Sequence, residues 1–183
     1  MEFIKKLSFI CQRSRCEFRT IGANDVSDAY VEGLKKQNEY LENNPKDMNK
    51  KIQEEYIKRI LASDDDTICG LFFDSELIGT AGIQNIMGKR EGPTTMGIFL
   101  FNDGLRGKGY GKTLVWASAF LTNACHHNTR FGAGMKKQNQ PSFRSFISCG
   151  FRKVFEDDAL IKVELSFESL QAPEFISHVQ LLP

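Results

Sequence analysis

The sequence predicts a mixed α/β fold, in which helices pack on a mixed β-sheet. This prediction rests first on the order of the expected elements, because parallel strands need a crossover connection and here a helix follows a strand directly. It rests also on size, since 183 residues, 41% of them hydrophobic, can bury an ordinary core. No long shift in composition marks a second domain, so residues 1–183 are expected to form a single domain.

The first third of the chain is expected to form one strand and two helices. Residues 17–21 (E-F-R-T-I) read as a short strand, and apolar residues then recur at helical intervals over about 26–41. Asn43-Asn44-Pro45 ends that helix. A second amphipathic helix is expected over about 49–62. Its apolar face should carry Ile52, Tyr56 and Ile60.

Three extended runs occupy the middle of the chain. Residues 67–73 and 77–86 are apolar and β-branched, and Asp74-Ser75-Glu76 between them reads as a hairpin turn. A third run, 94–101, leads directly into a glycine-rich loop. Ligands bind beyond the carboxyl ends of strands in open α/β sheets, so this loop is the first candidate site.

Beyond the loop, helices and strands alternate. Apolar residues at helical spacing over 114–124 predict a helix of about four turns, and 129–137 could form a strand. A short helix is expected over 141–149, because Pro141 suits a first helical turn and Gly150 a stop. Residues 161–167 alternate strictly, as a half-buried strand does. The tail, about 171–183, shows no period and is expected to be irregular.

The glycine loop N102-D-G-L-R-G-K-G-Y-G-K-T-L114 is not a nucleotide-binding P-loop. A Walker A motif needs a glycine where Arg106 stands, and the strictly alternating glycines also break the dinucleotide pattern G-x-G-x-x-G. Alternating glycines can instead turn successive amides inward as an anion-binding nest, at the positive end of a helix that begins near Gly109. Phosphate is the natural ligand, although a glycine-rich connection without any ligand stays an alternative.

Charge and cysteine usage exclude several classes of protein. Lys and Arg total 24 against 23 Asp and Glu, so the chain has no global attraction for nucleic acid or an anionic membrane. No signal peptide or 18-residue apolar segment is found, and a cytoplasmic protein is expected. Five scattered cysteines favour reduced thiols. Cys125-His126-His127 lacks a second ligand pair at zinc spacing, so no metal site is expected.

Two segments resemble a known family. The stretch Arg106-Gly-Lys-Gly109-Tyr-Gly111 is similar to the R/Q-x-x-G-x-G/A signature of the GNAT superfamily of N-acetyltransferases, and the strand before it resembles that family's splayed fourth strand. Residues 139–151, from Asn139 to Gly150-Phe151, are similar to its second signature. The resemblance covers about residues 66–168. It implies a central mixed β-sheet of about seven strands flanked by about four helices.

The same resemblance implies acetyl-CoA as co-substrate and no metal. Loop amides would hold the pyrophosphate, the end of the strand before the loop would pair with the pantetheine arm, and Asn139 would contact the pantetheine. An unpaired strand edge can satisfy the two amides of pantetheine. The coenzyme-binding residues so implied are Phe99, Leu100, Phe101, Arg106, Gly107, Lys108, Gly109, Tyr110, Gly111, Lys112 and Asn139.

The chain departs from the family where catalysis is concerned. Phe146 stands where a tyrosine usually protonates the departing thiolate, and Thr94, Thr95 and Met96 stand where many members carry a carboxylate base. An attacking amine must be neutral, and its pKa is near ~10.4, so proton removal through ordered water is expected. The catalytic residues themselves stay unidentified at this stage.

The expected function is transfer of an acetyl group from acetyl-CoA directly to a primary amine of a small molecule or amino sugar. The chain is most similar to the branch with ribosomal-protein N-terminal and amino-sugar acetyltransferases, so N-terminal or side-chain acetylation of proteins is one alternative. A non-catalytic acyl-CoA-binding regulatory module is another. The expected partner is the amine acceptor, with no nucleic acid or membrane, and a homodimer stays open. Polar residues that could face the acceptor are Tyr30, Asn38, Tyr40, Asn43 and Asn44.

Overall fold

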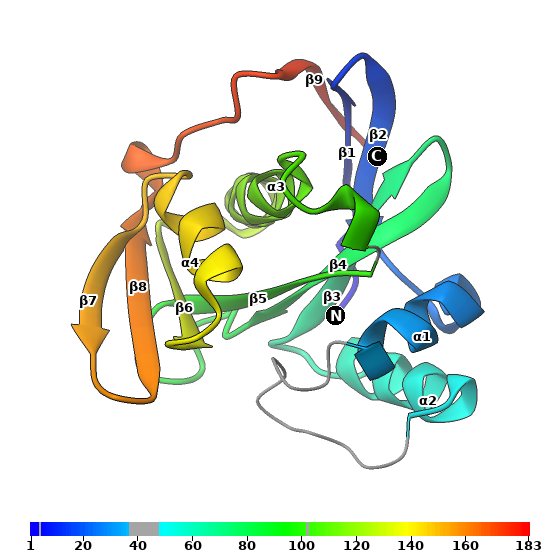
Figure 1. Ribbon diagram of the computed structural model, residues 1–183, viewed down its shortest axis with the longest axis horizontal. Coiled ribbons are helices and arrows are strands. Elements are labelled where there is room, and N and C mark those ends of the chain that lie inside the picture. The colour runs from blue at the N-terminus through cyan, green and yellow to red at the C-terminus, as the bar shows by residue number, and fades with distance from the viewer. Residues whose placement is uncertain (4, 37–47, 102) are drawn as a thin grey trace.

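One mixed sheet of nine strands runs through the described chain. The computed structural model describes residues 1–3, 5–36, 48–101 and 103–183. The strand order is β7-β8-β6-β5-β4-β3-β2-β1-β9 (Figure 1). Only β5 and β6 run parallel, and every other neighbouring pair is antiparallel. The predicted mixed α/β class is confirmed, with nine strands in place of about seven.

The helices and strands have the following bounds. The strands are β1 Lys6–Cys11, β2 Ser14–Thr20, β3 Thr67–Phe73, β4 Glu76–Gln84, β5 Thr94–Leu100, β6 Arg130–Lys136, β7 Arg152–Glu156, β8 Leu160–Ser166 and β9 Ile176–Leu182. The α-helices among the described residues are α1 Asp28–Lys36, α2 Lys50–Leu61, α3 Tyr110–His126 and α4 Gln140–Ile147. Short 3-10 turns include η1 Ala23–Asp25, η3 Asp103–Leu105 and η4 Phe167–Ser169.

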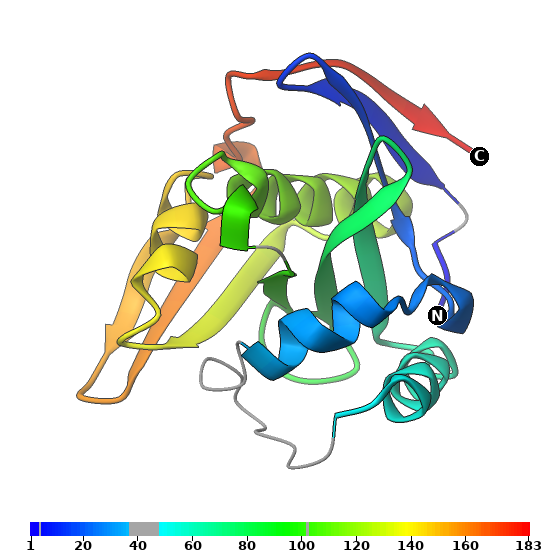
Figure 2. The same cartoon turned by 45° about the vertical axis from the view of Figure 1, so that its right-hand side comes forward.

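The helices form two layers on opposite faces of the sheet. Figures 1 and 2 show α3 and α4 on one face and α1 and α2 on the other. Most side chains of α3 are buried, because the helix lies between the sheet and the C-terminal segment that crosses from β8 to β9. Trp116 of α3 packs edge-on against Phe9 of β1, with ring centroids 5.5 Å apart.

Both ends of the chain add strands that were not expected from the sequence. The strand expected over 17–21 is β2, and β1 precedes it as the other half of a hairpin. The tail over 171–183 was expected to be irregular, and that prediction is wrong, since 176–182 form β9 along the free edge of β1. Most of β9 is exposed. It therefore carries little hydrophobic pattern of its own and takes its conformation from pairing.

The first two helices differ in detail from the prediction. Among the described residues α1 covers 28–36, so it begins two residues later than expected, and Val26 instead follows the turn η1. Residues 37–41 of the expected helix and its stop at 43–45 lie outside the described residues. In α2 the predicted face is wrong in part: Ile52 and Tyr56 are 37% and 38% exposed and Ile57 is fully buried, whereas Ile60 packs against the core as expected. The buried stripe is set by where α2 meets η1 and β3, which a helical period cannot specify.

The hairpin predicted at residues 74–76 is confirmed. β3 and β4 pair antiparallel, and Phe73 lies opposite Glu76. Asp74 and Ser75 have positive φ angles of 46° and 70°, as both central residues of a type I′ turn require. This hairpin places the start of β4 beside the end of β5, where Gly79 lies opposite Leu100.

Candidate active site

The candidate site begins where β5 leaves β6. β5 pairs with β4 along Thr95–Leu100, but its described pairing with β6 is limited to Thr94 and Thr95. Beyond these residues the β6 side of β5 has no strand partner in the described chain. A strand edge that lacks a neighbouring strand can bind an extended ligand through backbone hydrogen bonds.

The three residues expected to pair with pantetheine lie at the end of this edge. Phe99 and Leu100 close β5, and Phe101 follows it. The Phe101 side chain is buried and packs edge-on against Tyr30 of α1, with centroids 4.8 Å apart. The Phe101 ring thus packs into the core, so only the Phe101 backbone can pair with pantetheine. Tyr30, which was expected to face an acceptor, is buried too.

The glycine loop turns sharply into α3. Gly107 and Gly109 have φ angles of 75° and 88°, and Gly109 is the residue that precedes the first helical turn. The amide of Arg106 donates to the Asp103 carbonyl at 3.0 Å, and that of Lys108 donates to the Leu105 carbonyl at 3.4 Å. Two of the expected amide donors therefore already serve the loop itself.

The remaining amides lie in the first turn of α3. Thr113 is the first residue whose amide bonds back into the helix, to the Gly109 carbonyl at 2.9 Å. The amides from Gly109 to Lys112 have no acceptor within the helix, as at every helix start. Together with the helix dipole they form an arrangement suited to an anion.

The side chains of the loop contribute less positive charge than the sequence suggests. Arg106 pairs with Asp103, with Nε and Oδ1 2.9 Å apart. Lys108 is exposed, and Lys112 is half-buried with its carbonyl accepting from the Cys149 thiol at 3.3 Å. Tyr110 is buried edge-on against Phe73, with centroids 5.6 Å apart. Only its backbone remains for a ligand.

The three glycines face different surroundings. A β-carbon added at Gly111 would lie 2.8 Å from Ser145 Oγ of α4 and 3.8 Å from Ile98 Cδ1 of β5. One added at Gly109 would collide with the ring of Phe175, whereas Gly107 faces open space. Gly111 is therefore the glycine that allows the start of α3 to approach Ser145 of α4 closely.

Asn139 begins α4 and caps it. Its Oδ1 accepts a hydrogen bond from the Ser142 amide at 3.3 Å. The capping role weighed against coenzyme contact is thus present. A capping oxygen leaves the side-chain amide group of the same residue available as a donor.

Phe146, which replaces the expected tyrosine, is a core residue. It is 1% exposed and packs edge-on against Phe151, with centroids 5.0 Å apart. Burial raises the pKa of the neighbouring Cys149 thiol to about 12. His126 lies at the opposite end of α3, beside the ring of Phe3 at 5.3 Å. Neither Cys149 nor His126 is a candidate acid or base at the loop.

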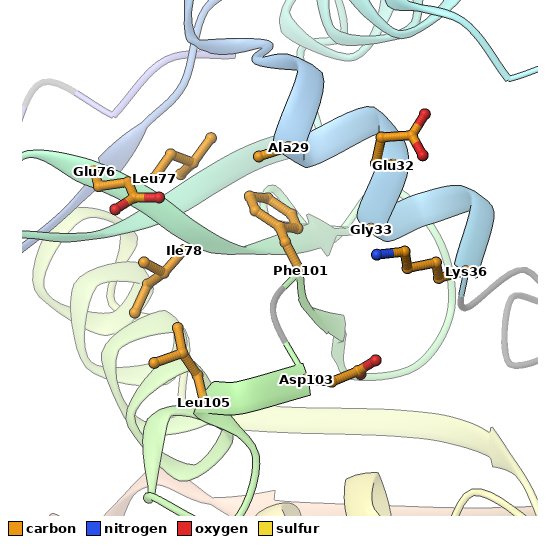
Figure 3. A pocket seen from close by; sticks show the side chains of 10 residues that line it. All are labelled: Ala29, Glu32, Gly33, Lys36, Glu76, Leu77, Ile78, Phe101, Asp103 and Leu105. Carbon is orange, nitrogen blue, oxygen red and sulfur yellow. The ribbon is translucent and has the colours of Figure 1, made fainter.

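A cavity of about 340 Å³ opens on the α1 side of the loop (Figure 3). Its walls come from α1, the start of β4, the end of β5 and η3, and they combine apolar side chains with three carboxylates and one lysine. The lining residues are Ala29, Glu32, Gly33, Lys36, Glu76, Leu77, Ile78, Phe101, Asp103 and Leu105.

None of the cavity's carboxylates is recognisable as a site residue in the sequence. Glu32, Glu76 and Asp103 are far apart in the chain, and each reads there as an ordinary surface charge. Glu32 also pairs with Lys35 at 3.1 Å, and Asp103 with Arg106. Of the polar residues expected to face an acceptor, Asn38, Tyr40, Asn43 and Asn44 lie outside the described residues.

Two broader features concern the described residues as a whole. Across them, no group of three or more His, Cys, Asp or Glu side chains could hold a metal ion. The same residues contain no helix long and apolar enough to cross a membrane.

Comparison with known proteins gives one family match. A family model described as "Acetyltransferase (GNAT) domain" matches residues 15–152. No curated protein matches the chain.

Solved structures resemble this fold over most of its length. Mycobacterium smegmatis RimJ in complex with CoA-disulfide has a TM-score of 0.70 at 15% identity, over 91% of this chain and 90% of that one. Spermidine N-acetyltransferase from Vibrio cholerae, in complex with CoA and spermine, has a TM-score of 0.69 at 12% identity, over 84% and 96%. Aminoglycoside acetyltransferase AAC(6')-Ib in complex with coenzyme A has a TM-score of 0.68 at 20% identity, over 84% and 96%. At these identities the likeness shows a shared fold.

Proposed function

The chain belongs to the GNAT family of acetyltransferases, and from that premise we propose that it acetylates the primary amine of a small molecule or an amino sugar by direct transfer. It is an N-acetyltransferase that uses acetyl-CoA as its co-substrate. The observation that supports the small acceptor is the cavity between α1, β4 and η3, which carries carboxylates on three separate elements.

We propose that the coenzyme lies between β5 and α4 with its pyrophosphate at the start of α3. The first-turn amides of α3 give it hydrogen-bond donors, and the absence of a side chain at Gly111 lets a ligand approach them. The backbone of residues 99–101 would pair with the pantetheine arm, and Asn139 would approach it from α4. When bound, acetyl-CoA supplies an acyl thioester. The chain supplies orientation through these backbone groups.

The acceptor cavity combines charge and apolar surface. Glu32, Glu76 and Asp103 lie around it, and Lys36 is the one cation among the lining residues that the structure describes. Carboxylates at a cavity mouth concentrate ammonium groups, and the effect weakens as salt screens it. The apolar floor, which includes Phe101, suits the carbon skeleton of an extended amine or the face of a sugar ring.

The reaction needs no tyrosine acid. A departing thiolate has a conjugate acid of pKa near ~8.5, so it can leave unassisted or take a proton from water or the new ammonium. We propose that water carries the proton from the amine as well, because neither Phe146 nor the Thr94–Met96 stretch holds a group that could accept it.

We propose further that residues 1–183 form one domain, since β9 at the end of the chain pairs with β1 near its start. A cytoplasmic location is proposed on the chemistry of the cysteines. All five are free, and four of them are buried. Thiols of this kind persist in reducing compartments.

The test is a screen of acceptors with acetyl-CoA, read as release of the CoA thiol. Spermidine, kanamycin, a simple amino sugar and short peptides with free N-termini should be compared. We expect turnover with small amines and amino sugars and little with the peptides. Acetylation of peptides alone would contradict the proposal and favour the protein-acetyltransferase alternative.

A matched pair of variants tests the cavity. Glu76→Gln should raise the KM for a cationic acceptor by about threefold to tenfold and leave the KM for acetyl-CoA unchanged, because it removes one carboxylate from the cavity. Glu91→Gln, at an exposed glutamate outside the cavity, is the control. Equal effects of the two substitutions would exclude the cavity as the acceptor site.

A further inference from the structure

We propose that Gln12, in the turn between β1 and β2, is a positioning residue that fixes the direction of an amide in the coenzyme loop. This inference rests on the proposed coenzyme site at the start of α3. Gln12 lies 96 positions before Lys108 in the chain, yet its side-chain amide Nε2 donates to the Lys108 carbonyl oxygen. No motif in the sequence points to this residue.

The contact acts through one peptide unit. The Lys108 carbonyl and the Gly109 amide belong to the same peptide bond, and in a planar trans peptide the C=O and N–H point in opposite directions. By holding the carbonyl toward the β1–β2 turn, Gln12 turns the Gly109 amide the other way. That amide is one of the four at the start of α3 that lack an acceptor within the helix.

Phe175 of the C-terminal segment also lies against the peptide unit that joins Lys108 and Gly109. The ring of Phe175 occupies the space that a β-carbon on Gly109 would need, and the Gln12 backbone amide donates to the Phe175 carbonyl at 3.4 Å. Cys11, next to Gln12, places its sulfur 3.8 Å from Thr113 Oγ1 in the first turn of α3. The turn, the C-terminal segment and the helix start therefore form one contact region.

The backbone of the turn favours a role for the side chain. Gln12 and Arg13 both have positive φ angles, 51° and 73°, in a two-residue connection between Cys11 and Ser14. Such positions prefer Gly, Asn or Asp, which tolerate the left-handed conformation at low cost. A glutamine in this conformation is strained, and retained strain of this kind is often associated with a functional contact.

One substitution at Gln12 distinguishes an effect on coenzyme binding from an effect on folding. Gln12→Gly relieves the backbone strain and removes the donor at once. We expect an equal or higher melting temperature together with a Kd for acetyl-CoA weakened by about threefold to tenfold, the range for loss of one neutral hydrogen bond. A role limited to stability would move both measurements in the same direction.

A second probe locates the effect at the pyrophosphate. S-acetylpantetheine carries the thioester and the pantetheine amides but lacks the pyrophosphate, so its Kd should be the same for the wild-type protein and Gln12→Gly. Gln180→Ala is the control, because Gln180 is an exposed glutamine on β9 and Gln12→Ala can be compared with it directly. Of these two alanine variants, only Gln12→Ala should weaken acetyl-CoA binding.

The outcomes distinguish this inference from the proposed function. Wild-type protein that fails to bind acetyl-CoA would overturn both. Wild-type binding with a Kd that stays within twofold in Gln12→Gly would overturn the positioning role alone. The positioning role is likewise overturned if Gln12→Gly weakens binding of acetyl-CoA and S-acetylpantetheine equally, or if its affinity and melting temperature fall together.

Discussion

Gly111 of α3 and Ser145 of α4 lie so close together that a β-carbon at position 111 would be 2.8 Å from Ser145 Oγ. Gly111→Val should weaken acetyl-CoA binding by about tenfold or more, because its side chain would displace Ser145 and obstruct the first-turn amides proposed to bind the coenzyme. The helix should form normally, since Gly111 has no positive φ. Calorimetric titration measures the change.

Gly82→Val is the control for that substitution. Gly82 lies on β4, and a β-carbon there would meet no atom within 4 Å. Unchanged coenzyme affinity in a folded Gly111→Val protein would place the coenzyme elsewhere.

Asn139 combines a structural contact with a proposed binding contact, and two substitutions separate them. Asn139→Ala should lower the free energy of unfolding by ~1 kcal/mol, because Oδ1 no longer caps α4 at the Ser142 amide. Asn139→Asp keeps a capping oxygen, loses the NH₂ donor and adds a negative charge that also disfavours an anionic coenzyme. We expect it to retain stability and to bind acetyl-CoA about threefold more weakly. If Asn139→Asp binds as tightly as the wild-type protein, Asn139 is a cap and nothing more.

Phe146 bears on the pH dependence of the reaction. Without a tyrosine acid, kcat should rise as the amine loses its proton and then level off, with no falling limb up to about pH 9.5. Tyr110 will not supply such a limb, because burial raises the pKa of its phenol. A reversible falling limb in protein shown to be folded at each pH would reveal an acid that the structure has not identified.

Substitution of Phe146 also changes a second quantity, the stability of the fold. Phe146→Tyr would bury a phenol in a site that is 1% exposed and should cost ~1–3 kcal/mol of stability if the hydroxyl finds no partner. Because position 146 lies in the core, the variant should not acquire a falling limb in its pH profile.

At the scale of single elements, α2 shows how tertiary contacts select a helix face. Ile57→Ala should lower the free energy of unfolding by ~2–5 kcal/mol, because it leaves a cavity at a fully buried position. Ile52→Ala, earlier in the same helix on an exposed surface, should stay within ~0.5 kcal/mol of the wild-type protein. Chemical denaturation of both variants tests the assignment, and the reverse order would restore the face predicted from the sequence.

β5 shows how an element can be ordered by one neighbour and left open toward the other. Its pairing with β4 extends to Leu100, while its described pairing with β6 stops at Thr95. The strand is thus held by β4 along most of its length, and its other edge is the one proposed to pair with the coenzyme. The sequence predicts the strand itself from its apolar run, but pairing partners are not encoded in such a run.

At the scale of the whole molecule, an ion pair between two separate elements makes the stability of the fold fall at acid pH. Arg19 of β2 binds both oxygens of Asp25 in η1, at 3.1 and 2.8 Å. Burial alone would raise the pKa of Asp25, but the hydrogen bonds from Arg19 and the Gly22 amide outweigh it and lower the pKa below 3.8. The ion pair therefore stabilises the folded protein fully above about pH 4. This stabilisation is lost as the pH falls through the lowered pKa that Asp25 has in the folded protein.

Asp25→Asn tests the direction in which this ion pair makes stability depend on pH. The variant should be less stable than the wild-type protein at neutral pH, and the difference should shrink as the pH falls toward about 3. Urea unfolding at a series of pH values measures it. A difference independent of pH would show that the Asp25 charge contributes nothing to stability.

The path of the C-terminal segment is also a property of the whole molecule. The segment between η4 and β9 crosses α3, and β9 then pairs with β1, so the two ends of the chain meet on one edge. In this arrangement Phe175 lies against Gly109, and the β1–β2 turn contacts the glycine loop through Gln12 and Lys108. Contacts between segments so distant in the chain cannot be inferred from local pattern.

The sequence by itself determined the elements and signatures whose signal is local. Alternating glycines before an apolar helix, the strict alternation of β8 and the hairpin at Asp74-Ser75 each follow from steric limits on neighbouring residues. The resemblance of residues 106–111 and 139–151 to two family signatures likewise needs only their order and spacing, and the GNAT family match agrees with it.

Only the tertiary structure decided which of those residues share a surface. It turned Gly111 toward α4 and Gly109 toward Phe175, assigned the Asn139 oxygen to a helix cap, and gathered Glu32, Glu76 and Asp103 around one cavity. It also formed β9 from a tail without a period, because backbone pairing along β1 satisfies hydrogen bonds that a side-chain pattern does not record. The physical reason is common to all of these: burial and pairing depend on partners distant in the chain, whereas sequence periodicity reports only the preferences of one segment.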